Sequence, residues 1–199
     1  DGNALRPTEG EQWELGVKYQ PTAFDGLITA SLYDLRQKNV NRSVLEGGIA
    51  GIRQIGEVKS RGLEIEATAE IADAWKLRAG YAYNKTEQVA PEGDPLNGNQ
   101  LADAPNHIAS IWLDREFANG LRVGGGVRYI GDRFIDAANS AELDSVTLVD
   151  LGAAYSRDNV EMSLNLTNVT DEVYVSACGF SYCSYGEGRT VSAKVTYKW

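Results

Sequence analysis

The 199-residue sequence lacks any run of about 18 apolar residues, which excludes a transmembrane helix. It also lacks a basic excess: the formal net charge of −9 argues against a nucleic-acid partner, because phosphate binding needs concentrated Lys and Arg. The N-terminus has neither the basic nor the apolar segment of a secretory signal peptide. We therefore expect a fragment or processed piece of a longer protein.

Patterns of catalytic and metal-binding residues are missing as well. The single histidine, His107, has no adjacent nucleophile or second ligand, and no triad or supported carboxylate dyad occurs. The glycines at 124–126 lie inside a strand-like pattern that no helix follows, so they are no phosphate cradle and instead permit curvature or close backbone approach. We expect no enzyme, no catalytic residue and no metal or cofactor held by side chains.

What the sequence does contain is alternation of apolar and polar residues with a period of two, repeated between turn clusters. The low content of Met and His beside 21 Gly, 10 Tyr and 4 Trp also favours β structure. A long loop containing Gly47, Gly48 and Gly51 is expected between the second and third strands. The pattern predicts about nine strands, near residues 13–20, 28–37, 63–71, 75–83, 107–113, 121–129, 149–155, 160–166 and 190–199.

The connections between these strands alternate strictly between short turns and long loops, the later long loops being 89–104, 131–145 and 170–188. Outer-membrane barrels have this rhythm, with short periplasmic turns and long extracellular loops. Aromatic residues near strand ends fit the girdles that flank a barrel's apolar band; they are Trp13, Tyr19, Trp75, Tyr81, Tyr83, Trp112, Tyr129, Tyr155, Tyr197 and Trp199. The sequence predicts an all-β, antiparallel up-and-down transmembrane β-barrel.

Five segments in order resemble the C-terminal third of TonB-dependent siderophore receptors, especially the ferrichrome-type hydroxamate subgroup. They are residues 5–19 (LRPTEGEQWELGVKY), 56–64 (GEVKSRGLE), 104–107 (APNH), 123–129 (VGGGVRY) and 165–174 (NLTNVTDEVY). Barrels of this family have about 22 strands and a lumen closed by an N-terminal plug. The resemblance implies that residues 1–199 are the last nine strands of a 22-stranded barrel, with the plug and earlier strands absent, so the chain alone should transport nothing.

The resemblance also implies a function in the bacterial outer membrane. Extracellular loops would bind an iron–siderophore as the transported ligand, and TonB would contact the missing N-terminal part. Another cargo for such a receptor (vitamin B12, haem or an oligosaccharide), a plug-less porin-like barrel and a soluble β-sandwich binding module remain alternatives.

Two cysteines, Cys178 and Cys183, lie in the last long loop. A disulfide is expected because an exported protein passes through an oxidising periplasm. A zinc site would need two more ligands, and the only histidine is far away on a strand. The similar hydroxamate receptors often carry a cysteine pair in this loop, where it would stiffen the loop tip.

Three aromatic residues, Phe180, Tyr182 and Tyr185, crowd the same loop. They either contact the iron–siderophore through ring faces and hydrogen bonds, or pack on one another and shield the disulfide. The acidic residues Asp132 and Asp136 and their neighbours Glu142 and Asp144 leave a similar choice: a solvated loop, or a divalent-ion site shared with lipopolysaccharide.

The chain ends on Trp199, with Tyr197, Val195 and Val191 at alternate positions before it. Bacterial outer-membrane proteins typically end in such a strand, which the barrel assembly machinery reads. The resemblance therefore implies an assembly signal that includes Tyr197 and Trp199, in a strand whose apolar face contacts membrane lipid.

Overall fold

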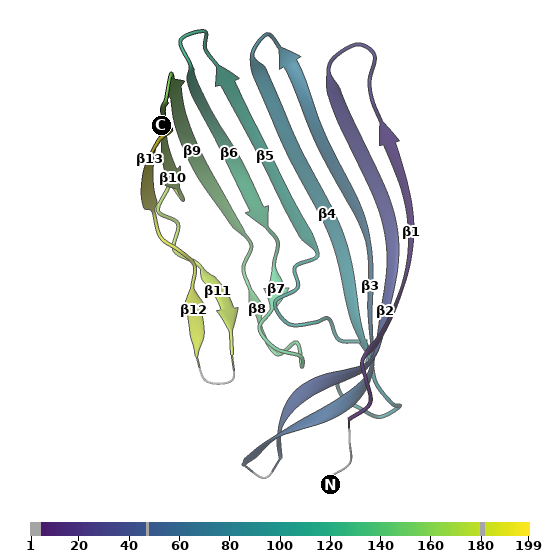
Figure 1. Cartoon of the computed structure of the whole chain (residues 1–199). Helices are drawn as coiled ribbons and strands as arrows, with labels where there is room; N and C mark the ends of the chain where they lie inside the picture. Colours follow the sequence, from purple (N-terminus) through teal and green to yellow (C-terminus); the bar gives the residue numbers. More distant parts are fainter. Residues whose placement is uncertain (1–4, 47, 180–181) are drawn as a thin grey trace.

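The nine predicted strands are present and form one curved antiparallel sheet (Figure 1). The computed structural model describes residues 5–46, 48–179 and 182–199. Each strand pairs with its neighbour in the chain, which confirms the up-and-down topology. The strands of the sheet are β1 (Glu9–Tyr19), β2 (Gly26–Glu46), β3 (Ile49–Ala72), β4 (Trp75–Val89), β5 (His107–Glu116), β6 (Leu121–Ile130), β9 (Val146–Arg157), β10 (Val160–Thr167) and β13 (Thr190–Tyr197). No helix of the described residues is long and apolar enough to cross a membrane.

The two ends of the sheet differ in the length of their connections, as the sequence predicted, with the β2–β3 connection as the exception. In Figure 1 the short turns lie at the top, and the longer connections lie at the bottom together with the extended β2–β3 hairpin. We call these the short-turn end and the long-loop end. Two small hairpins lie at the long-loop end: β7 (Arg133–Phe134) pairs with β8 (Glu142–Leu143), and β11 (Val175–Cys178) pairs with β12 (Cys183–Tyr185).

The predicted long loop between the second and third strands is wrong. β2 and β3 instead continue as one hairpin, paired from Gly26↔Ala69 as far as Glu46↔Ile49. Gly51 sits within the ladder opposite Val44, and of the two described glycines here only Gly48 has a positive φ, of 81°. Glycine signalled a loop in the sequence, but glycine weakens a strand without necessarily ending it, and here the ladder continues through Gly51.

The alternation of side chains separates two faces of the sheet, as expected of a strand period of two. One cross-strand row of the first face runs through Val17, Ala30, Ile65 and Tyr81. Large apolar side chains are exposed across this face, which we call the outer face: Trp13, Leu15, Val17, Tyr19, Leu32, Ile65, Tyr81, Ile111, Val123, Val127, Leu151, Met162, Leu164, Val191, Val195 and Tyr197. Such a face is typical of a barrel wall that contacts lipid.

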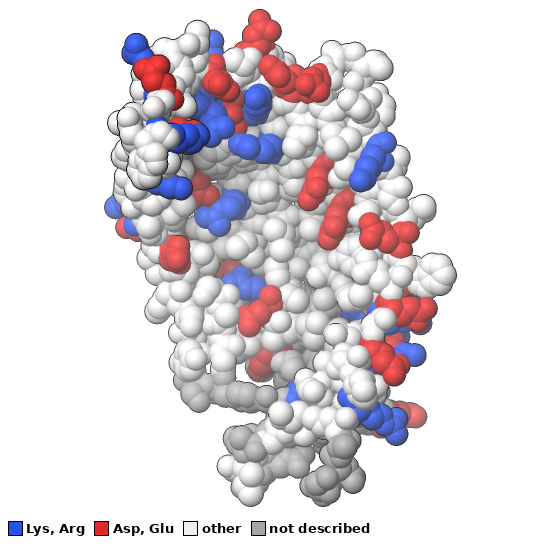
Figure 2. Space-filling view, viewed as in Figure 1, with Lys and Arg blue, Asp and Glu red and all other residues white. Residues whose placement is uncertain are grey.

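Little hydrophobic core exists behind that face. Among the described residues only Val58, Val146 and Leu148 are buried apolar side chains. The opposite or inner face carries charged and small polar groups, and Figure 2 shows basic and acidic side chains close together over a hollowed surface. The sheet therefore presents its apolar side outward and its polar side to a concave interior, the reverse of a soluble domain.

Candidate functional site

The last long connection carries the residues that the sequence singled out. A disulfide joins Cys178 to Cys183, which are directly paired at the end of the β11–β12 hairpin. Tyr182 and Tyr185 are 74% and 73% exposed, so neither ring is packed away. Phe180 lies outside the described residues. The structure thus brings the disulfide and two open phenol rings together on one short hairpin.

The base of this connection is built around Asn168, which is 2% exposed and has a positive φ of 50°. Its side-chain amide donates to the carbonyls of Glu172 (2.9 Å) and Glu187 (3.0 Å), and its amide oxygen accepts the Glu172 N–H (2.8 Å). One side chain therefore fastens the outgoing and the returning arm of the loop. Asn is well suited because it tolerates the left-handed conformation and offers both donors and an acceptor.

A second attachment comes from Arg133 of β7, which is 4% exposed. Its Nη2 donates to two successive carbonyls of β11, those of Val175 (2.8 Å) and Ser176 (2.7 Å). Its Nη1 is buried and finds no hydrogen-bond partner within the described ranges. The 131–145 loop and the β11–β12 hairpin are thus joined by a buried guanidinium.

The 131–145 loop is in turn bonded to the preceding loop. The carbonyl of Ala137 accepts from the side chains of Gln88 (2.9 Å) and Asn99 (3.0 Å). Asn139 and Gln100 form a reciprocal pair: the Gln100 N–H donates to Asn139 Oδ1 at 2.8 Å, and Asn139 Nδ2 donates to the Gln100 carbonyl at 3.0 Å. Side-chain bonds therefore link three connections of the long-loop end in series.

The acidic residues of the 131–145 loop do not gather into one group of potential metal ligands. Over the described part of the chain, no three His, Cys, Asp or Glu side chains gather as metal ligands would. Asp136 instead caps its own turn: its carboxylate accepts the hydroxyl of Ser140 and the Ser140 N–H (3.0 Å). These hydrogen bonds, led by that of the hydroxyl, hold the pKa of Asp136 below its ordinary value.

Two ion pairs on the inner face have a largely buried carboxylate. Arg78 Nη2 lies 2.5 Å from Asp114 Oδ1, and Arg128 makes two bonds to Asp150, at 2.5 and 3.2 Å. In both pairs the carboxylate is largely buried, at 5% and 13% exposure, whereas the guanidinium remains about half exposed. Each arginine thus keeps an accessible face toward the concave interior.

Trp112 also faces the interior, and it was wrongly grouped with the girdle aromatics. It pairs with Arg78 on one side and Gly126 on the other, in the same row as Asp150. A Cβ added at Gly126 would lie 2.6 Å from the indole, and one at Gly152 would lie 3.3 Å from it. The indole lies against bare backbone there, which is the close approach that the glycines at 124–126 were expected to permit.

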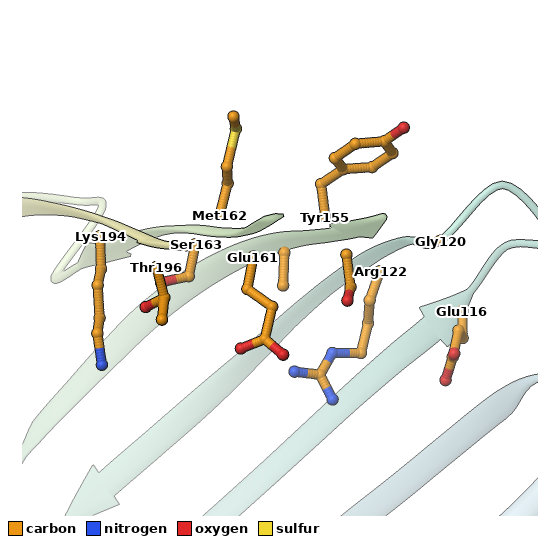
Figure 3. A pocket seen from close by; sticks show the side chains of 11 residues that line it. Glu116, Gly120, Arg122, Tyr155, Glu161, Met162, Ser163, Lys194 and Thr196 are labelled. Carbon is orange, nitrogen blue, oxygen red and sulfur yellow. The ribbon is translucent and has the colours of Figure 1, made fainter. Parts of the chain in front are cut away.

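A hollow of about 420 Å³ lies on the inner face at the short-turn end. Figure 3 shows Glu161, Lys194, Arg122 and Glu116 on the inner side of the sheet, while Met162 and Tyr155 point to the opposite side. The hollow is charged and broadly open, and Glu161 is already paired with Lys198 at 2.5 Å. We assign it no separate ligand.

Of the two terminal aromatic residues, Tyr197 lies on the outer face and Trp199 lies beyond the end of β13. Tyr197 pairs with Val160 at the end of β13 and is 59% exposed, and Trp199 is fully exposed. His107 is also on the outer face, where its Nδ1 lies 2.9 Å from the Tyr81 hydroxyl. The assembly role of Tyr197 and Trp199 stays a prediction.

Sequence reasoning missed three of the residues that shape this site: Arg133, Asn168 and Gln88. Arg133 had a signal, since it is the one basic residue of an otherwise acidic loop. Asn168 lies inside the segment 165–174 that resembles the receptor family, but nothing in the sequence distinguishes it from the nearby Asn165. Gln88, only 2% exposed, had no signal: it lies near the end of β4, beyond the 75–83 strand that the sequence predicted, where it looks like any polar residue next to a loop.

An up-and-down sheet with an apolar outer face, a charged inner face and its long connections at one end defines the wall of a transmembrane β-barrel. The family model "TonB dependent receptor-like, beta-barrel" matches residues 1–169. The chain belongs to this family of TonB-dependent receptors.

Its similarity to individual relatives extends over almost the whole chain. It is 40% identical over 203 residues to the ferrioxamine receptor of Yersinia enterocolitica, covering 97% of this chain and 28% of that protein. It is 34% identical over 209 residues to the ferrichrome outer membrane transporter/phage receptor of Escherichia coli K12, covering 100% and 28%. The chain therefore spans little more than a quarter of these relatives.

Solved structures agree on the fold. The siderophore receptor PiuA from Acinetobacter baumannii superposes with a TM-score of 0.78 at 27% identity, over 96% of this chain and 28% of that one. BauA, the ferric preacinetobactin receptor of the same species, also gives 0.78, at 22% identity over 94% and 29%. At that lower identity the likeness concerns the fold alone.

Proposed function

We propose that this chain is the C-terminal barrel part of a TonB-dependent outer-membrane receptor that imports an iron–siderophore complex. The observation that carries the proposal is the 40% identity to a ferrioxamine receptor over 97% of the chain. The relatives include receptors for ferrioxamine and ferrichrome. Both of these ligands are chelates of ferric iron, and we propose the same class of cargo for this receptor.

The remainder of the receptor lies outside these residues. A plug and the earlier strands complete a barrel of about 22 strands in the bacterial outer membrane, and TonB acts on the N-terminal part. The exposed arginines of the inner-face pairs Arg78–Asp114 and Arg128–Asp150 suit contact with a polar plug. This chain then supplies wall, outer loops and the final strand.

The long-loop end is the extracellular end in this proposal, and its aromatic hairpin contacts the cargo. Tyr182 and Tyr185 present open rings and hydroxyls, and Phe180 adjoins them in sequence. Ferric iron in a siderophore is already fully coordinated, so the protein contacts the organic shell through ring faces and hydrogen bonds. No side chain of the receptor needs to ligate the metal.

The terminal strand guides assembly. Tyr197 on the outer face and the fully exposed Trp199 beyond the end of β13 are open to a factor that recognises alternate aromatic positions. The barrel assembly machinery binds this strand during insertion, and lipid and lipopolysaccharide then surround the finished outer face.

Uptake of radioactive iron tests the proposal. The full-length receptor is expressed in an iron-starved strain that lacks its own hydroxamate receptors, with and without TonB. We expect uptake from ferric ferrioxamine B or ferrichrome that requires TonB. Uptake of vitamin B12, haem or an oligosaccharide instead would assign another cargo, and TonB-independent leakage of small solutes would indicate a porin-like barrel.

A further inference from the structure

The β11–β12 hairpin needs an anchor outside itself. It forms a two-stranded sheet separate from the main one, with strands of 4 and 3 residues and an irregular register between Val175 and Ala177. Two short strands alone are marginally stable in water. The disulfide ties these strands to each other and gives them no fixed position relative to the barrel.

Arg133 provides that position. Among the described residues, its two bonds to Val175 and Ser176 are the only hydrogen bonds that reach the hairpin from another element. The loop base at Asn168 holds the arms at Glu172 and Glu187, on the barrel side of the hairpin. Arg133 therefore fixes the hairpin's direction, while Asn168 fixes where it starts.

One of the two carbonyls that Arg133 binds belongs to Val175, which lies opposite the exposed Tyr185 in the hairpin. Val175 is the cross-strand partner of Tyr185, and Ser176 Oγ donates to the Ser184 carbonyl at 3.0 Å. From Ser184 the chain leads directly to Cys183 and its disulfide. A shift of Val175 is thus passed to Tyr185 and, through the ladder, to the segment that bears Tyr182.

Burial makes this contact costly to lose. Hydrogen bonds from a charged donor are stronger than neutral ones, and a buried charge without partners is strongly unfavourable. No carboxylate lies within ion-pair distance of Arg133 among the described residues, so the two carbonyls are its only described acceptors. The hairpin cannot leave its place without stranding the guanidinium.

We infer that Arg133 is a positioning residue for cargo binding: it holds the β11–β12 hairpin in the pose that presents Tyr182 and Tyr185. The inference rests on the proposed function, since it takes those two rings as cargo contacts. A hairpin held in place before the cargo arrives loses less conformational entropy on binding. Removing the hydrogen bonds from Arg133 to the hairpin should therefore weaken the affinity for the cargo and leave the transport step itself intact.

The experiment compares Arg133→Met, Arg133→Lys and the unchanged receptor, each full-length and in outer-membrane vesicles. Methionine fills similar space without donors, whereas one lysine ammonium can donate to both carbonyls. Arg157→Met is the matched control, because Arg157 is exposed at the short-turn end and its ion pair with Asp158 is long, at 3.8 Å. Amide hydrogen exchange in residues 175–179 and 182–186 reports the hairpin, and exchange in β9 and β10 reports the barrel.

We expect Arg133→Met to speed exchange in the hairpin alone and to weaken equilibrium binding of ferric ferrioxamine B or ferrichrome about tenfold, or about 1.4 kcal/mol. Uptake should fall at low chelate concentration and recover at saturation, with Arg133→Lys close to the unchanged receptor and Arg157→Met indistinguishable from it. If Arg133 had only a structural role, Arg133→Met would lower both the amount of folded receptor and the uptake at saturating chelate.

If amide exchange in the hairpin is unchanged in Arg133→Met, Arg133 does not hold the hairpin in place. If exchange is faster but the affinity for the chelate is unchanged, Arg133 has no role in cargo binding. If the unchanged receptor binds neither chelate, the proposed function fails, and the exchange measurement still decides whether Arg133 holds the hairpin.

Discussion

Asp150 Oδ1 accepts the backbone N–H of Asn168 at 2.9 Å, so a carboxylate on the inner wall holds the first residue of the last long loop. The same carboxylate binds Arg128, whose guanidinium is 46% exposed to the interior. A continuous set of bonds therefore runs from the concave face to the base of the disulfide-bearing connection.

Replacing this carboxylate should loosen the loop and the wall together. Asp150→Ala removes three charge-assisted bonds and leaves Arg128 without its partner, at an expected cost of about 2 kcal/mol. Urea unfolding of the receptor in detergent measures the loss, and hydrogen exchange in residues 168–189 should rise with it. Asp158→Asn is the control: that carboxylate is 88% exposed, asparagine tolerates the positive φ of 51° at this position, and removal of the surface ion pair should change stability little. Equal effects of the two substitutions would contradict the assignment.

The packing of the Trp112 indole against Gly126 can be tested by adding a single methyl group at that glycine. Gly126→Ala would place a Cβ 2.6 Å from the indole and 2.5 Å from the Ile111 carbonyl, so the ring must leave its place. We expect a loss of about 1–3 kcal/mol, as for other overpacked sites. Gly80→Ala, also on the inner face, meets nothing closer than the Ser110 hydroxyl at 3.5 Å and should be tolerated. An unaltered tryptophan emission spectrum in Gly126→Ala would show that the ring had not moved.

Two glycines with the same backbone angle should respond differently to alanine. Gly48 and Gly120 have φ values of 81° and 84°, but a Cβ at Gly48 meets open space and one at Gly120 lies 2.2 Å from the Ser156 carbonyl. Gly48→Ala should cost about 1 kcal/mol of backbone strain alone. Gly120→Ala adds a collision between β-turn and neighbouring strand, so it should lower the yield of folded barrel, measured by heat-modifiable migration on gels. Similar yields would show that strain dominates at both sites.

The 131–145 loop should loosen in acid. Because the pKa of Asp136 is lower in the folded loop than in an unfolded chain, the ionised carboxylate stabilises the fold above the unfolded value and that contribution disappears as the pH falls through the folded value, below about 4. Protease cleavage within the loop, followed against pH, should therefore rise in this range. Asp136→Asn should make cleavage independent of pH there, and an unchanged acid response in that variant would place the titrating group elsewhere.

The number, order and faces of the strands could be predicted because each depends on local alternation, which the row from Val17 to Tyr81 illustrates. The β2–β3 extension could not be, because a glycine such as Gly51 looks alike in a loop and in a ladder until its partner strand is known. The inner-face position of Trp112 was missed for a related reason: the space for its indole is left by Gly126 and Gly152, which lie on other strands. Cysteine pairing followed from chemistry, whereas the contact of Arg133 with Val175 joins positions 42 residues apart and has no local signature.

The Ala137 carbonyl, shared as an acceptor by Gln88 and Asn99, and the hydrogen bonds of Arg133 join the three connections of the long-loop end into one unit. Under the proposed function, a cargo-binding surface that is already assembled needs no rearrangement before first contact, so the rate of encounter would be set by diffusion. Chelates that fit differently would then be told apart by how long each stays bound.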